Sequence, residues 1–203
     1  FVYGDWRGRF YPPDLPYGQR LAFYARHFNA VEINASFYRL PQAAAVRRWV
    51  RETPAGFAFA FKAPRQLTHR LRLAEGEGED ILQAFFRALA PAREAGRLAA
   101  VLWQLPPSFK ADLPRLAAFC ARLPADVRHA FEFRHPSWRE EAVLRFFRTA
   151  SLPLAFVDAD GPSVAPPDAD GLPGRFAYFR RHGTEGLGRG AYGRELLAPL
   201  AAR

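Results

Sequence analysis

The residues that could perform chemistry stand at the ends of six short apolar segments of the sequence. Carboxylate and imidazole groups can move protons, whereas guanidinium, ammonium and amide groups can hold the oxygen atoms of an anionic substrate. In chain order these polar residues are Glu32 and Asn34, Lys62, Gln104, Glu132 and Arg134, Asp158, and Arg180 and His182. If the six ends meet in the folded chain, the sequence predicts a site for acid–base chemistry on a cationic background.

The predicted proton-transfer groups are carboxylates and histidines. Glu132 or Glu32 would act as general base, and His182 or His69 as general acid, because imidazole titrates near neutral pH. Asp158 adds a further carboxylate that is a candidate catalytic group.

The predicted binding groups are cationic or amide side chains. Lys62, Arg134 and Arg180 would hold phosphate oxygens, and Asn34 and Gln104 would supply additional hydrogen bonds. This set favours a small anionic substrate, such as a phosphate ester, or a nucleic acid.

Two other interpretations of the same residues stay open. The charges could be ion pairs that close one end of the fold, with Glu32 bound to Lys62 and Glu132 bound to Arg134 or Arg180. Carboxylates and His182 could also bind a metal ion, although the basic residues between them oppose a second cation. No metal-ligand spacing or nucleotide-binding loop supports a particular cofactor, so we assign no metal ligands and no cofactor.

Strand-like and helix-like segments alternate along the chain. Strands are expected at 30–34, 57–62, 99–105, 128–133, 154–158 and 175–181. Helices are expected at about 17–28, 41–52, 79–95, 112–123, 137–149 and from about 193. Asp112 suits a helix N-cap, and Ser137 followed by Glu140 fits a capping box. Such alternation predicts an α/β fold with a parallel sheet.

Side-chain parity favours a closed (β/α)8 barrel of the TIM type over an open sheet. Phe57, Phe59 and Phe61 share one face of their strand, while Ala58, Ala60 and Lys62 share the other. Bulky residues would then pack against outer helices, and the inner face would become polar at the carboxyl end. We expect one domain over residues 1–203, with the first and last strands of the barrel missing at the two ends of this sequence.

The composition describes a basic protein without membrane or disulfide signals. The formal net charge is +9, and Lys62 and Lys110 are the only lysines, so arginine supplies nearly all of the positive charge. Such an excess arises either from attraction to phosphates or from a GC-rich genome. Cys120 is the single cysteine, which excludes an internal disulfide. No apolar run is long enough for a membrane span, so we expect a cytoplasmic protein with no membrane partner. The oligomeric state is not predicted.

Five ordered motifs resemble a known family: VEINASFYRLP, FKAPRQLTH, LWQLPPSF, EFRHPSW and YFRRHG. They resemble the domain-of-unknown-function 72 (YecE-like) family over nearly the whole chain. The resemblance implies a TIM-type barrel and no established reaction. It also adds Tyr38 and Trp138 to the candidate substrate-binding residues.

Two further functions compete with phosphate-ester hydrolysis. Carboxylates at the mouth of a barrel are also typical of glycoside hydrolases, with Glu32 and Glu132 as the candidate pair. A non-catalytic barrel that binds nucleic acid or another ligand would use the same charges without breaking a bond.

Overall fold

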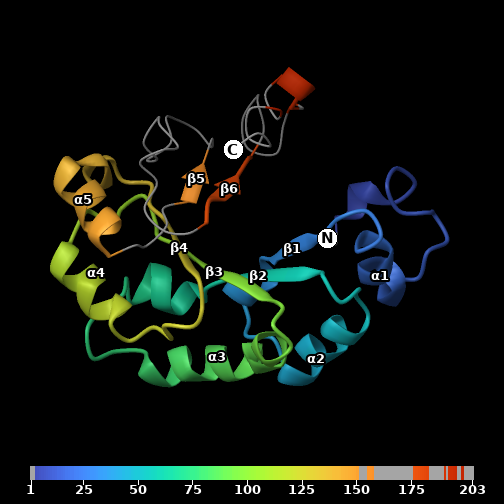
Figure 1. The fold of residues 1–203 in the computed structure, drawn as a ribbon, viewed down its shortest axis with the longest axis horizontal. Helices are drawn as coiled ribbons and strands as arrows, with labels where there is room; N and C mark the ends of the chain where they lie inside the picture. Colours follow the sequence, from blue (N-terminus) through green and yellow to red (C-terminus); the bar gives the residue numbers. More distant parts are fainter. Residues whose placement is uncertain are drawn as a thin grey trace. The chain divides into compact units, whose positions relative to one another are not determined.

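Parallel strands dominate the computed structural model, which describes residues 3–150, 155–157, 176–182, 190, 192–195 and 198. Each of the six predicted strand segments contains a strand in the described part of the chain (Figure 1). The strands are β1 (Ala30–Ile33), β2 (Ala58–Lys62), β3 (Leu98–Gln104), β4 (His129–Glu132), β5 (Ala155–Val157) and β6 (Tyr178–Arg180).

The strands are ordered as they occur in the sequence. One sheet has the order β1-β2-β3-β4, and β5 pairs with β6 in a second, parallel ladder. Ala30 lies opposite Ala58 and Ile33 opposite Phe61, so β1 and β2 run in the same direction. The predicted α/β fold with a parallel sheet is therefore confirmed for these strands.

Five α-helices connect or flank these strands within the described residues. They are α1 (Arg20–Tyr24), α2 (Ala43–Arg51), α3 (Glu79–Glu94), α4 (Leu113–Cys120) and α5 (Glu141–Thr149). Asp112 caps α4 as predicted, because its Oδ1 accepts a hydrogen bond from the amide of Arg115 at 3.1 Å.

The predicted capping box at Ser137 is wrong. Residues Pro136–Arg139 form a 3-10 turn, and α5 begins at Glu141. The Ser137 hydroxyl accepts a hydrogen bond from the amide of Ala111 at 2.8 Å and lies 2.9 Å from His135 Nδ1. These partners occupy the hydroxyl that a capping box would direct at the helix, so the helix starts later.

The chain divides into two compact units. The first unit comprises residues 1–102 and 119–128, and the second comprises residues 103–118 and 129–203. In the first unit α2 and α3 cover one face of β1 and β2 (Figure 1). Phe57, Phe59 and Phe61 are buried in this core, whereas Ala58, Ala60 and Lys62 are half-buried, as the parity of the strand predicts.

An aromatic cluster forms the core of the second unit. The ring of Phe133 stacks on that of Trp138 with centroids 3.7 Å apart, and Phe131 and Phe147 contact Phe133. All four side chains are buried. This cluster fixes the backbone on both sides of the last residue of β4, Glu132, whose side chain belongs to the candidate site.

Candidate functional site

Glu132 forms the centre of an ion cluster in the second unit. Its side chain is fully buried at the carboxyl end of β4. Arg134 donates a hydrogen bond from Nε to Oε1 at 2.9 Å, and its Nη2 forms an ion pair with the same oxygen at 2.8 Å. Arg180, at the end of β6, donates to Oε2 from Nη1 at 2.7 Å. Both carboxylate oxygens are thus bound by guanidinium groups. The ion pairs of Glu132 with Arg134 and Arg180, which the sequence analysis kept as an alternative, are therefore present.

Among the described residues, the ion pairs of the cluster join two guanidinium groups to the carboxyl group of Glu132. Guanidinium groups keep their charge in proteins. The Arg134 side chain is 28% exposed and that of Arg180 is 10% exposed, so an anion can reach the first more easily. A carboxylate at this position orients both guanidiniums and leaves the cluster suited to a second anion.

His182 joins the cluster through Arg180. Its Nε2 lies 3.4 Å from Nη1 of Arg180. An arginine nitrogen can only donate, so this contact requires an unprotonated Nε2 on the imidazole. An imidazole in that state can accept a proton.

Trp138 anchors the second unit. Its indole N–H donates to the carbonyl oxygen of Phe109 at 2.7 Å, and its side chain is completely buried. Gln104 ends β3 and is 9% exposed. The amide of the next residue, Leu105, donates to the carbonyl oxygen of Glu132 at 2.9 Å, which places Gln104 near the ion cluster along the backbone.

Lys62 and His69 gather around one aromatic ring in the first unit. The Lys62 ammonium lies 4.1 Å from the centroid of Phe37, and the His69 ring meets Phe37 nearly edge-on at 4.9 Å. His69 Nδ1 also lies 3.0 Å from the hydroxyl of Thr68. The hydroxyl of Ser36 lies 2.7 Å from the carbonyl oxygens of both Ile33 and Lys62, and so joins the ends of β1 and β2.

The remaining predicted residues differ in accessibility. Glu32 lies opposite Ala60 and is half-buried, whereas Asn34 is exposed. Tyr38 is 79% exposed. Asp158 lies outside the described residues. The structure therefore brings Glu132, Arg134, Arg180 and His182 together in the second unit, and Lys62 and His69 together in the first.

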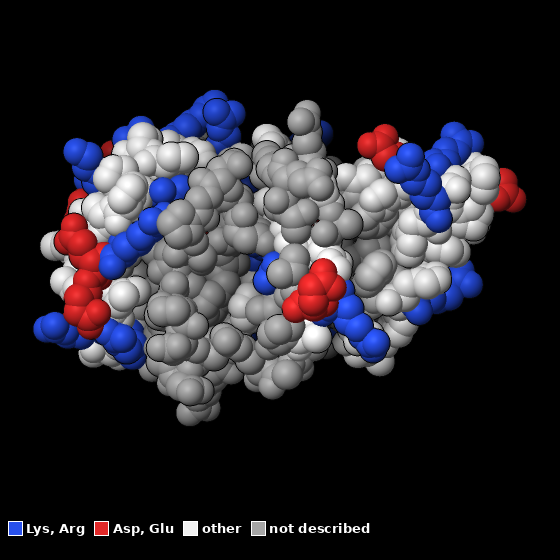
Figure 2. All heavy atoms as spheres, turned by 90° about the horizontal axis from the view of Figure 1, so that it is seen from above, with Lys and Arg blue, Asp and Glu red and all other residues white. Residues whose placement is uncertain are grey.

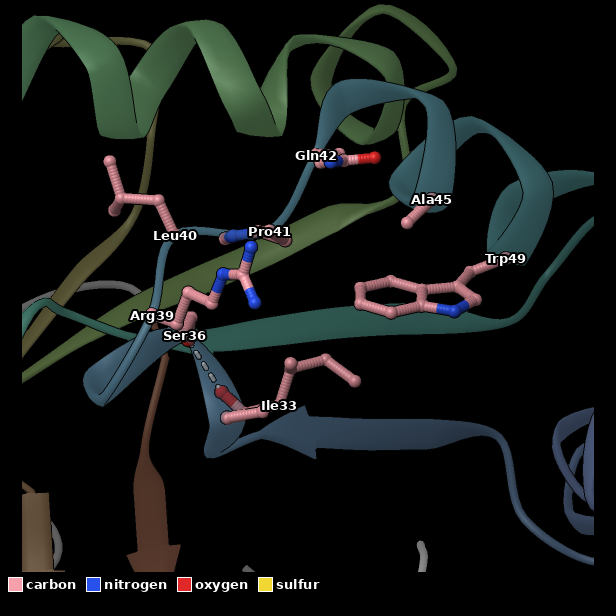
Figure 3. Close-up of a pocket in the computed structure, with 9 residues that line it drawn as sticks. Ile33, Ser36, Arg39, Leu40, Pro41, Gln42, Ala45 and Trp49 are labelled. Atoms are coloured by element: carbon pink, nitrogen blue, oxygen red, sulfur yellow. Dashed lines mark hydrogen bonds between the residues drawn. The ribbon is translucent and has the colours of Figure 1, made fainter.

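Two pockets in the first unit contain residues that the sequence analysis missed. A pocket of about 320 Å³ is lined mainly by apolar side chains, and Arg39 and Trp49 extend into it from opposite sides (Figure 3). A neighbouring pocket of about 380 Å³ is lined by Arg39, Arg65 and Arg70 among others. The signal that could have found them is the arginine content of YRLP and APRQLTHR, which form the ends of the first two motifs, with Arg70 directly after the second.

Three other features of the described residues concern metal binding, the thiol of Cys120 and the membrane. Across the described ranges, no group of three or more His, Cys, Asp or Glu side chains could hold a metal ion. Burial raises the pKa of the Cys120 thiol to about 12, so this cysteine stays protonated at neutral pH. In the described part of the chain, no helix has the length and apolar character needed to cross a bilayer.

Basic side chains are dispersed over the surface. Figure 2 shows one face on which Lys and Arg atoms form several separate groups, some of them beside Asp or Glu atoms. Among the described residues of this face they do not merge into one continuous basic area. Anion binding is therefore better sought at local clusters than over a whole face.

Comparisons with known proteins agree on one family. A model of the family described as "Protein of unknown function DUF72" matches residues 1–203. The UPF0759 protein YunF of Bacillus subtilis is 36% identical over 132 residues, which are 63% of this chain and 47% of that protein. The UPF0759 protein YecE of Escherichia coli K12 is 36% identical over 116 residues, which are 57% of this chain and 41% of that protein. The chain thus spans less than half the length of these curated relatives.

Solved structures of similar proteins share the fold. A DUF72 family protein from Thermotoga maritima is 31% identical, with a TM-score of 0.78 over 98% of this chain and 82% of that chain. A DUF72 family protein from Enterococcus faecalis is 24% identical, with a TM-score of 0.74 over 90% of this chain and 78% of that chain. None of these descriptions assigns a reaction.

Proposed function

We propose that this chain, which belongs to the DUF72 family, is an enzyme that acts on an anionic substrate, a phosphate ester, at the Arg134–Glu132–Arg180 cluster. The observation that carries the proposal is a fully buried carboxylate with both oxygens bound by guanidinium groups. Burying the charge of Glu132 and most of that of Arg180 is costly, and a well-packed apolar core would serve stability as well. The cluster is therefore better explained by what its two arginines can bind.

Arg134 and Arg180 would hold the substrate's phosphate oxygens. A guanidinium has five N–H donors, and the contacts with Glu132 involve Nε and Nη2 of Arg134 and Nη1 of Arg180. A planar fork of such donors matches phosphate oxygens in pairs. In this scheme Glu132 is a positioning residue that fixes both guanidiniums.

Proton transfer would fall to His182. Its Nε2 is in contact with Arg180 and is unprotonated in that contact. The contact with Arg180 is long at 3.4 Å, so Nε2 can give it up and use the same lone pair to accept the proton of an attacking water molecule. It would afterwards return this proton to the leaving oxygen of the ester. The predicted role of Glu132 as general base is less favoured, because both of its oxygens already accept strong hydrogen bonds. The same argument disfavours Glu132 as one of the two carboxylates of a glycoside hydrolase.

We also propose that the whole chain is one domain of a closed (β/α)8 barrel. Support comes from the strand order β1-β2-β3-β4 and β5-β6, which follows the sequence without reversal. Open doubly wound sheets reverse their strand order at a switch point, whereas barrels do not. β5 also lies next to β4. Within this proposal Glu32, Asn34, Tyr38, Lys62, His69, Gln104 and Asp158 keep the candidate roles predicted from the sequence, and a cytoplasmic location stays a prediction.

The proposed activity is tested with chromogenic esters and the purified full chain. We expect release of nitrophenol from 4-nitrophenyl phosphate or bis(4-nitrophenyl) phosphate. Arg134→Lys should lower kcat/KM by about tenfold to hundredfold, because hydrogen bonds to charged groups are worth about 1.5–3 kcal/mol. Arg134 is chosen because its side chain is partly exposed and the bond between Arg180 and Glu132 is retained.

The matched control is Arg145→Lys, an exposed arginine on α5. It makes the same chemical change away from the cluster and should leave kcat/KM within about twofold of the parent. Equal turnover by the parent and Arg134→Lys would remove the cluster from the mechanism. Cleavage of 4-nitrophenyl glycosides in place of the phosphate esters would favour the glycoside hydrolase function.

A further inference from the structure

The pocket of about 380 Å³ in the first unit has the character of an anion site. It opens between the loop after β1, the helical turn Gln66–Arg70 and the first turns of α3. Arg65 and Arg70 line it with Asp80, and Arg39 lies on the wall that it shares with the apolar pocket. All four charged side chains are exposed, so a ligand can reach them.

Within the described part of the chain, Arg65 and Arg70 of this pocket are not engaged by carboxylates. None of the ion pairs among the described residues involves Arg65 or Arg70. By contrast, Arg93 and Arg122, also in the first unit, bind Asp126 and Glu79. An exposed pair of guanidiniums in a concave surface is suited to phosphate oxygens.

Tyr38 adds an exposed flat surface at the same pocket. Its ring is 79% exposed although it is a large aromatic side chain. It meets the ring of Phe37 at 90° with centroids 5.0 Å apart, and Phe37 is itself buried against Lys62 and His69. The tyrosine ring is therefore supported from one side and open on the other, which is the arrangement that stacks a nucleobase.

The wall of the pocket is built for a fixed shape. Gly78, the N-cap of α3, has φ 69°, and a Cβ at this position would lie 2.7 Å from the side chains of Leu67 and Leu71. Only glycine combines this backbone conformation with so close an approach. The turn that carries Arg70 is consequently packed directly against the start of α3.

We infer that this pocket binds a single strand of nucleic acid, with Arg65 and Arg70 on backbone phosphates and Tyr38 stacked on a base. A strand supplies both a chain of phosphates and open base faces, whereas a duplex keeps its bases stacked inside. The inference goes beyond the proposed function and does not rest on it, because strand binding requires no chemistry at Glu132.

The test is the fluorescence anisotropy of a fluorescein-labelled oligothymidylate of about 12 nucleotides, titrated with the full chain at several salt concentrations. Arg65→Ala/Arg70→Ala should weaken binding about tenfold or more at low salt. It should also reduce the slope of log affinity against log salt by about 1.4, since each phosphate contact on a single strand contributes about 0.7. The matched control, Arg47→Ala/Arg51→Ala, removes the same charge from exposed positions of α2 and should retain the parent's slope.

Two single variants separate stacking from simple charge. Tyr38→Ala should weaken binding by about fivefold to hundredfold, and Tyr38→Phe should restore it, because stacking needs the ring and not the hydroxyl. Asp80→Asn should strengthen binding, because it removes a carboxylate that lines the pocket. The inference is overturned if the parent does not bind the strand, if it prefers a duplex of equal length, or if the two double variants lose affinity equally.

Discussion

Arg180 and Glu132 are joined by a hydrogen-bonded ion pair across 48 positions of the sequence, with Nη1 of Arg180 2.7 Å from Oε2 of Glu132. Neither side chain is more than 10% exposed. Because the two residues end different strands, β6 and β4, this pair ties distant segments of the second unit together. Its integrity should therefore matter to folding as well as to anion binding.

Glu132→Gln should destabilise the protein strongly. The substitution keeps the shape of the side chain but removes the buried negative charge that pairs with Arg134 and Arg180. Breaking a buried ion pair from one side costs about 3–5 kcal/mol. The free energy of unfolding in urea, followed by circular dichroism, measures this loss.

The control for that experiment is Glu141→Gln. Glu141 pairs with Arg148, but its side chain is 63% exposed, so we expect a loss below about 1 kcal/mol. If the two substitutions lowered the free energy of unfolding by similar amounts, the protein in solution would not have a buried ion pair at Glu132.

Arg97→Lys should also lower stability, for a different reason. Arg97 is 8% exposed, and burial lowers the pKa of its guanidinium. It donates to the carbonyl oxygen of Phe57 at 2.7 Å, to that of Val50 at 3.1 Å and to the hydroxyl of Thr53 at 2.6 Å. A lysine has one nitrogen and cannot span these acceptors, so we expect a loss of about 2–3 kcal/mol in urea unfolding.

Arg93→Lys is the matched control for Arg97. Arg93 binds Asp126 on the surface, where a salt bridge contributes less than about 1 kcal/mol. If Arg97→Lys and Arg93→Lys had the same free energy of unfolding, the hydrogen bonds of the Arg97 guanidinium would not contribute to stability.

Tyr11 should make stability depend on pH in the alkaline range. Its side chain is 1% exposed, and burial, followed by the nearby Tyr24, raises its pKa from 10.0 to about 12. The folded state therefore holds the phenol proton more tightly than the unfolded state. This contribution to stability is complete below about pH 10 and is lost as the pH rises toward 12.

Thermal unfolding between pH 8 and pH 12 measures the effect of Tyr11. The Tm of Tyr11→Phe should fall less steeply above pH 10 than that of the parent, because phenylalanine has no proton to lose. Tyr17→Phe, at a side chain that is 69% exposed, should follow the parent curve. If Tm fell equally with pH in the parent and in Tyr11→Phe, the pKa of Tyr11 would be the same in the folded and the unfolded state.

The fold could be predicted where the signal is local. Alternation of side chains in FAFAFK gave the buried face of β2, and Asp112 gave the start of α4, because both depend on neighbouring residues. The prediction of a capping box at Ser137 was wrong because the Ser137 hydroxyl accepts a hydrogen bond from the amide of Ala111, 26 positions away. Such a partner is set by tertiary structure and leaves no mark in the local sequence.

The residues that the structure gathers around Glu132 were named from the sequence, and the pairing of Glu132 with Arg134 or Arg180 was one of its alternatives, whereas the role of these residues stays a prediction. Glu132, Arg134, Arg180 and His182 were named because each ends or follows a strand. That Glu132 binds both arginines depends on β4 and β6 coming together, which spacing alone does not give. Arg65 and Arg70 were missed because their importance comes from a pocket formed by three segments.

The most direct test of the proposed anion site is a crystal structure of the protein grown without sulfate or phosphate and soaked with tungstate. Tungstate mimics a phosphate group, and its metal atom is located by anomalous scattering. We predict a tungstate ion within hydrogen-bond distance of both Arg134 and Arg180, and its loss in Arg134→Lys crystals but not in Arg145→Lys crystals. Ordered arginines with no anion beside them, while tungstate binds elsewhere, would contradict the account.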